Sequence, residues 1–194
     1  FQPRVVPQYW ENVHSVAVSS LDQLYLQAQL SWPVFNEFVI RWAANSGGQI
    51  DDGGCGELVP VTPGQSHRIS GTPLKGVRRA VEKAQRSYHQ DVSRLVDVVR
   101  QSIVFPRLED LCTCLEMICQ DESVRIVRIK NRLACDHPSD TSGGYRDVAV
   151  NLLIENEETI SLGVRGHVYE LQLLLEPFYR LKSVCGHKRY VTYR

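Results

Sequence analysis

The sequence predicts an α+β protein: a mixed β-sheet of about five strands flanked by helices, with a helical segment at its N-terminal end. Apolar residues alternate with polar ones in several stretches, as in half-buried strands. Elsewhere apolar residues recur every three or four positions, as in amphipathic helices. The chain has 194 residues, of which 43% are hydrophobic, enough for a sizeable core.

Overall charge points to no particular partner, because 22 basic residues balance 22 acidic ones. Basic residues nevertheless recur at 75–86, 125–132 and 180–194, which suits a small anionic ligand better than a long nucleic acid. No apolar run is long enough for a membrane helix. The six cysteines include no C-x-x-C pair and favour a reducing compartment. We therefore expect an intracellular, cytoplasmic protein with no membrane contact.

Helical spacing begins after Ser20, and Pro33 suits the first turn of a second helix that ends near Asn45. Residues 46–73 are rich in Gly, Pro, Ser and Asp, which predicts a long loop.

Helical spacing returns over residues 74–88. Lys75, Arg79, Glu82 and Arg86 lie in one polar stripe of that helix, with Lys83 beside it. Such a stripe is either a solvated face or the wall of a phosphate site.

A strand is expected over residues 98–105, with Asp97 at its start, and a helix after Pro106 with Leu108, Leu111 and Cys112 on its buried face. The next strand, residues 124–132, becomes basic toward its end. Strict alternation would place its Arg128, Lys130 and Arg132 on the same face as Val124 and Ile126.

Two further strands are expected at 145–154 and 167–175, separated by an acidic turn at 155–158, before a last helix from Pro177. One face of the first carries Tyr145 and Asn151. The second is dense in leucine, yet Glu170 and Gln172 share one of its faces.

These strands place polar groups where neighbouring strands could bring them together. Directly paired residues have Cβ atoms about 5 Å apart, so Asp97 and Glu170 could share a magnesium ion. Tyr145 follows two glycines and could stack on a nucleobase.

Four segments, taken in order, resemble the RelA/SpoT synthetase-domain family over roughly residues 70–190. They are Asp97–Phe105, Val127–Arg132, Gly144-Tyr145-Arg146-Asp147 and Glu170-Leu171-Gln172-Leu173. The resemblance implies a nucleotidyltransferase-like fold and transfer of pyrophosphate from ATP to the 3′-hydroxyl of a guanine nucleotide. It divides the chain into a helical segment with a long loop (1–70) and a catalytic domain (71–194).

The resemblance also implies roles for individual residues. Asp97 and Glu170 would be catalytic and hold Mg²⁺, and Glu170 would also activate the acceptor. Tyr145 would stack on the acceptor base. The remaining expected nucleotide-binding residues are Lys75, Arg79, Lys83, Arg86, Lys130, Arg132, Asn151 and Gln172.

The chain departs from the family pattern at Pro73, Gly143, Ala149 and Leu174, where the family has Arg, Asn, His and a basic residue or His. Two alternatives therefore stay open. One is a catalytically silent nucleotide-binding or protein-interaction domain, and the other is transfer to an RNA 3′ end, with the basic tail His187–Arg194 on the phosphates.

Overall fold

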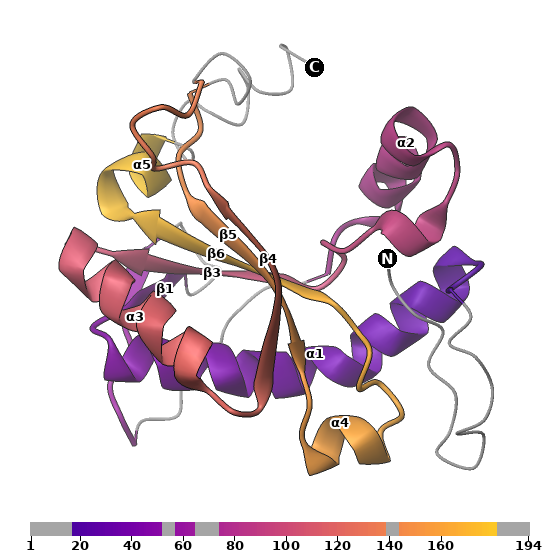
Figure 1. Cartoon of the computed structure of the whole chain (residues 1–194), viewed down its shortest axis with the longest axis horizontal. Helices are drawn as coiled ribbons and strands as arrows, with labels where there is room; N and C mark the ends of the chain where they lie inside the picture. Colours follow the sequence, from indigo (N-terminus) through magenta and orange to yellow (C-terminus); the bar gives the residue numbers. More distant parts are fainter. Residues whose placement is uncertain (1–16, 52–56, 65–73, 139–143, 182–194) are drawn as a thin grey trace.

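A mixed six-stranded sheet organises the fold (Figure 1). The computed structural model describes residues 17–51, 57–64, 74–138 and 144–181. The sheet order is β2-β1-β3-β6-β5-β4, in which β3 and β6 are parallel and the other neighbours antiparallel. The strands are β1 (Gln49–Asp51), β2 (Leu58–Pro60), β3 (Arg100–Phe105), β4 (Val124–Asn131), β5 (Val148–Ile154) and β6 (Tyr169–Leu175).

Helices lie on both sides of the sheet. Helices α1 (Leu21–Asn45) and α3 (Leu108–Gln120) cover the face that carries the main core (Figure 1). Helices α2 (Val77–Tyr88) and α5 (Glu176–Leu181) lie toward the other face. A 3₁₀ turn, η2 (Val92–Arg94), follows α2, and the short α4 (Glu157–Ser161) connects β5 to β6. The predicted α+β class with helices flanking a mixed sheet is thus confirmed.

The second face of the sheet carries two cross-strand rows of side chains. Register pairs align Arg100, Glu170, Asn151 and Arg128 across β3, β6, β5 and β4. The next row aligns Ser102, Gln172, Ala149 and Lys130. Directly paired residues share a face, so polar groups gather here from all four strands. The opposite face of β6 buries Tyr169, Leu171 and Leu173.

The N-terminal helix corrects the expectation of two helices. Helix α1 runs through Pro33 without a break, and Ser20 caps its start by accepting a hydrogen bond from the Gln23 amide. Pro33 has no backbone N–H to donate, so it weakens the helix at this point. Val34, Phe35 and Phe38 are nevertheless buried just after it, and this packing keeps the helix continuous.

The long loop predicted over residues 46–73 instead contains β1 and β2. Ile50 is buried, which anchors β1 although the segment is only three residues long. Gly48 permits the approach to β3, because a Cβ there would lie 2.5 Å from Cγ2 of Ile103. Only glycine fits so close a contact.

The expectation for β4 was also wrong, because a β-bulge interrupts its alternation. The pairing with β5 shifts between Ile126 and Arg128. Val124 and Ile126 therefore pair with core-face residues, whereas Arg128 and Lys130 pair with Asn151 and Ala149 on the other face. An extra residue in one strand changes which face the following side chains occupy.

Several element boundaries also differ from the expected ones. β5 starts at Val148 rather than Tyr145, and α2 starts at Val77, so Lys75 precedes the helix. The acidic turn is the start of α4, where Asn156 and Thr159 form a capping box. In α3 the buried cysteine is Cys114, and Cys112 is exposed.

Other expectations lie outside the described residues, including those for Pro73, Gly143 and the tail His187–Arg194. Within the described parts of the chain, no helix is long and apolar enough to cross a membrane. The division of the chain at residue 70 stays a prediction.

Candidate active site

Asp97 lies just before β3 and is held by two lysines. It is 6% exposed, and its Oδ2 accepts hydrogen bonds from Lys75 Nζ at 2.5 Å and Lys83 Nζ at 2.8 Å. Burial opposes the ionisation of Asp97, but the ammonium groups of Lys83 and Lys75 outweigh it and lower its pKa. The carboxylate is therefore charged at neutral pH.

The two lysines reach Asp97 from different directions. Lys75 lies in a short segment beside β3, where its amide donates to the Val98 carbonyl and Leu74 forms a bridge with Val99. Lys83 comes from α2, a helix that buries only Ala80 and Ala84 among its described side chains. Through Lys83, Oδ2 of Asp97 thus links α2 to the residue that lies just before β3.

Glu170 begins the polar face of β6 and lies close to Asp97. Its amide donates to the carbonyl of Val99 at 3.0 Å, and its Oε1 accepts a hydrogen bond from Gln172 Nε2 at 3.0 Å. Burial and the negative charge of Asp97 raise the pKa of Glu170, which Lys83 and Arg100 partly offset. The two acids that the sequence suggested are 73 positions apart in the chain. In the fold they lie within electrostatic range of each other, at the start of the adjacent strands β3 and β6.

These two acids fit a hard divalent cation. Oδ1 of Asp97 is buried and has no hydrogen-bond partner among the described residues, so one oxygen of the carboxylate is uncommitted. Magnesium is typically held by one or two carboxylates together with substrate phosphates. Among the described residues no group of three or more His, Cys, Asp or Glu side chains gathers to form a complete protein cage. The donor set suits an ion that arrives with a phosphorylated ligand.

Tyr145 is half-buried rather than fully exposed. Its ring packs against the small apolar cluster of Val104, Leu174 and Tyr179, which lies on the same side of the sheet as the polar rows. Its hydroxyl donates to Gln172 Oε1 at 3.4 Å. Burial and the nearby Asp147 raise the pKa of Tyr145, so the hydroxyl stays protonated. Stacking on a nucleobase stays a prediction.

Arg132 is held over the Tyr145 ring by Asp147. Its Nε and Nη2 donate to the two carboxylate oxygens of Asp147 at 2.7 and 3.0 Å, and Asp147 is fully buried. The guanidinium carbon lies 5.4 Å from the ring centroid, within cation–π range. The expected phosphate ligand Arg132 is thus committed to a buried partner in the free protein.

Asn151 also has structural partners. It is 2% exposed, and its Oδ1 accepts hydrogen bonds from Nε and Nη2 of Arg128 at 3.2 and 2.8 Å. Its Nδ2 donates to the carbonyls of Val96 and Tyr169 at 3.4 Å. Asn151 thus holds Arg128 in the first row, with Asn151 itself between Arg128 and Glu170.

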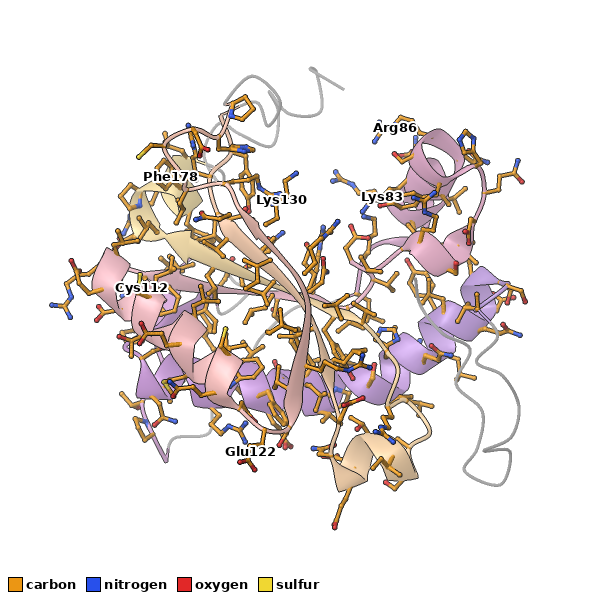
Figure 2. The ribbon with its side chains drawn as sticks, viewed as in Figure 1. Lys83, Arg86, Cys112, Glu122, Lys130 and Phe178 are labelled. Atoms are coloured by element: carbon orange, nitrogen blue, oxygen red, sulfur yellow. The ribbon has the colours of Figure 1, made fainter. Side chains whose placement is uncertain are left out.

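The remaining expected basic residues are exposed. Figure 2 shows Lys83 and Arg86 on α2 and Lys130 on the sheet, on the same side of the molecule. Arg79, Arg86 and Lys130 are exposed to solvent.

The two described departures from the family pattern have different surroundings. Ala149 lies between Gln172 and Lys130 in the second row, so the missing histidine side chain would have stood at the centre of the polar face. Leu174 is fully buried in the cluster with Val104 and Tyr179, which explains why an apolar residue stands there.

Sequence reasoning missed Arg100, Arg128 and Asp147 as site residues. Arg100 was detectable, because it shares the period-two face of Ser102, whereas Ile103 and Phe105 on the other face belong to the core. Arg128 and Asp147 carried no such signal, since the bulge and the arginine–aspartate pair depend on the fold.

His167 is not part of this site. It is completely buried beside Tyr169, with ring centroids 5.2 Å apart, and burial lowers its pKa to about 3. Neither ring nitrogen has a hydrogen-bond partner among the described residues.

Comparison with solved structures identifies the fold as that of small alarmone synthetases. The structure of small alarmone synthetase 2 from Bacillus subtilis matches with a TM-score of 0.61 and 16% identity, covering 88% of this chain and 79% of that one. A chain in the complex between the Type VI effector Tas1 and its immunity protein matches with a TM-score of 0.53 and 15% identity, over 93% of this chain and 77% of that one.

Small alarmone synthetase 1 from Bacillus subtilis, solved with its product pppGpp, aligns with a TM-score of 0.49 and 20% identity over 60% of each chain. The present chain thus matches only about 60% of that protein's length. No family model and no curated protein sequence matches the chain.

Proposed function

We propose that the protein is a magnesium-dependent pyrophosphokinase of the RelA/SpoT type that transfers pyrophosphate from ATP to a ribose hydroxyl of a nucleotide. The observation that carries the proposal is the meeting of Asp97 and Glu170 beside Lys75 and Lys83. They meet on a sheet whose fold matches small alarmone synthetase 2.

The proposed reaction breaks one bond and makes one. The acceptor hydroxyl oxygen bonds to the β-phosphorus of ATP, the bond from that phosphorus to the α–β bridging oxygen breaks, and AMP leaves. Glu170 takes the hydroxyl proton. Its raised pKa suits that role, because a base whose pKa lies nearer the working pH accepts a proton more readily.

The other residues position and neutralise the substrates. Asp97 and Glu170 would hold Mg²⁺, which when bound supplies positive charge to the phosphate oxygens. Lys75, Lys83, Arg79 and Arg86 would bind the donor phosphates, and Tyr145 would orient the acceptor base. Phosphoryl-type transfer depends mainly on such positioning and charge neutralisation.

A transfer assay tests the proposal. The protein is incubated with ATP labelled on the β- or γ-phosphate, magnesium and a panel of nucleotides, and products are separated by chromatography. We expect AMP and a nucleotide that carries an added pyrophosphate on a ribose hydroxyl. Glu170→Gln should lower the rate by at least about 100-fold, the usual contribution of a positioned base. Asp97→Asn should also lower the rate, because it removes the charge of a proposed Mg²⁺ ligand. Glu122→Gln removes an exposed carboxylate and should leave the rate unchanged.

Absence of transfer to every nucleotide, with ATP binding intact, would contradict the enzyme proposal. That outcome would favour the second candidate, a silent nucleotide-binding domain. One observation supports this candidate: in the free protein Lys75 and Lys83 are bound to Asp97, and Arg132 is bound to Asp147. Including an RNA with a free 3′ end in the panel tests the remaining alternative acceptor.

A further inference from the structure

Arg100 occupies the position closest to Glu170 on the neighbouring strand. It begins β3, three residues after Asp97, and is the direct register partner of Glu170 in the parallel β3–β6 pair. Its charge lowers the pKa of Glu170 and also that of Lys75. Arg100 is therefore within electrostatic range of both groups.

The free protein leaves Arg100 without a polar partner among the described residues, whereas the other cations close to the acids are engaged. Lys75 and Lys83 are bound to Asp97, and Arg128 is bound to Asn151. Arg100 is exposed. Arg100 is thus an exposed cation that belongs to the first of the two cross-strand rows.

The net charge of the side chains around Asp97 and Glu170 favours binding of an anion. Lys75, Lys83 and Arg100 together exceed the charge of Asp97 and Glu170 by one, even when both acids are ionised. A guanidinium presents a planar fork of donors that matches phosphate oxygens. An exposed arginine on a lone strand would more simply be solvated, but here it is the direct cross-strand partner of Glu170, a proposed metal ligand.

We propose that Arg100 is a substrate-binding residue that contacts the phosphate oxygens of the donor nucleotide next to Glu170. This inference rests on the proposed function for the identity of its ligand. It adds a phosphate contact that the resemblance did not assign, on a face where Ala149 removes an expected histidine.

Equilibrium binding separates this inference from the reaction. Isothermal titration calorimetry with α,β-methylene ATP and magnesium measures affinity without turnover, because the bond that would break is replaced. Arg100→Gln should weaken binding by about tenfold or more, the usual loss for a charge-assisted contact. Arg100→Lys should recover part of that loss. The lysine ammonium keeps the positive charge but lacks the planar pair of donors that a guanidinium offers to phosphate oxygens.

Arg125→Gln is the matched control. Arg125 lies on the same sheet, but it is paired with Glu155 at 3.3 Å at the far end of β4. Its removal should leave the affinity unchanged. Arg100→Gln should also leave the melting temperature within about 2 °C of the parent, because exposed substitutions rarely change stability much.

The outcomes distinguish the two proposals. Unchanged affinity in Arg100→Gln overturns the role of Arg100 and leaves the proposed function intact. Weakened binding in that variant, with no transfer by the parent protein, upholds the role of Arg100 and removes the enzyme proposal. If the parent protein binds no α,β-methylene ATP, both proposals fall.

Discussion

At the scale of single residues, the two acids of the site are charged under different conditions. Asp97 is kept ionised by two ammonium groups, whereas Glu170 is pushed toward its protonated form by burial and by Asp97. Two carboxylates in one site whose pKa values are driven apart are a recurring arrangement for acid–base work.

The raised pKa of Glu170 predicts a stability effect. The folded state holds this proton more tightly than the unfolded state, so ionisation of Glu170 destabilises the fold as pH rises above its ordinary pKa. Glu170→Gln should therefore be more stable than the parent above about pH 5. The difference should vanish below about pH 4.

Urea unfolding between pH 3 and pH 8 measures this effect. Glu122→Gln, an exposed substitution of the same kind, is the control and should show no such trend. A Glu170→Gln variant that is less stable than the parent at pH 8 would show that the charged form is favoured in the fold.

The Asp147–Arg132 pair predicts a large loss of stability. Asp147 is fully buried, so Asp147→Ala would leave the largely buried guanidinium of Arg132 without its partner. Breaking a buried pair on one side costs about 3–5 kcal/mol. Unfolding in urea checks this. Glu155→Gln removes the shared partner of Arg125 and Arg165, both of which are exposed, and should cost less than about 1 kcal/mol. Equal effects from the two variants would contradict the assignment.

At the scale of elements, α2 is joined to the rest of the molecule by few contacts. Its buried side chains are two alanines, and Lys83 supplies its ion pair to Asp97. At the end of the helix Tyr88 packs against the main core and lies under Arg94. Lys83 is the residue that links the helix that carries Arg79 and Arg86 to the proposed metal ligand.

Lys83→Met should loosen α2 selectively. Amide hydrogen exchange over residues 77–88 should become at least about fivefold faster, while exchange in β5 and β6 stays unchanged. Arg78→Met is the control, because Arg78 only pairs with Glu82 on the exposed surface of the same helix. Unaltered protection of α2 in Lys83→Met would mean that other contacts hold the helix.

The bulge in β4 is a second feature of this scale. If Val127 paired regularly instead of forming the bulge, the alternation begun by Val124 and Ile126 would send Arg128 and Lys130 toward the core face. One irregular residue thus delivers two cations to the polar rows.

At the scale of the whole molecule, local patterns in the sequence determined much of the architecture. The α+β class, the two faces of β6 and the helical character of 77–88 follow from periodicity, because side-chain direction in strands and helices is set by local backbone geometry. The proximity of Asp97 and Glu170 followed from motif order together with the expected pairing of strands.

Only the tertiary structure decided which charged groups are engaged. Lys75, Lys83 and Arg132 were all expected to bind the nucleotide, yet each is paired with a specific carboxylate in the fold. Arg100, which no motif singled out, has none among the described residues. The physical reason is that ion pairing depends on distances of a few ångströms between distant segments, and strand register and the bulge set those distances.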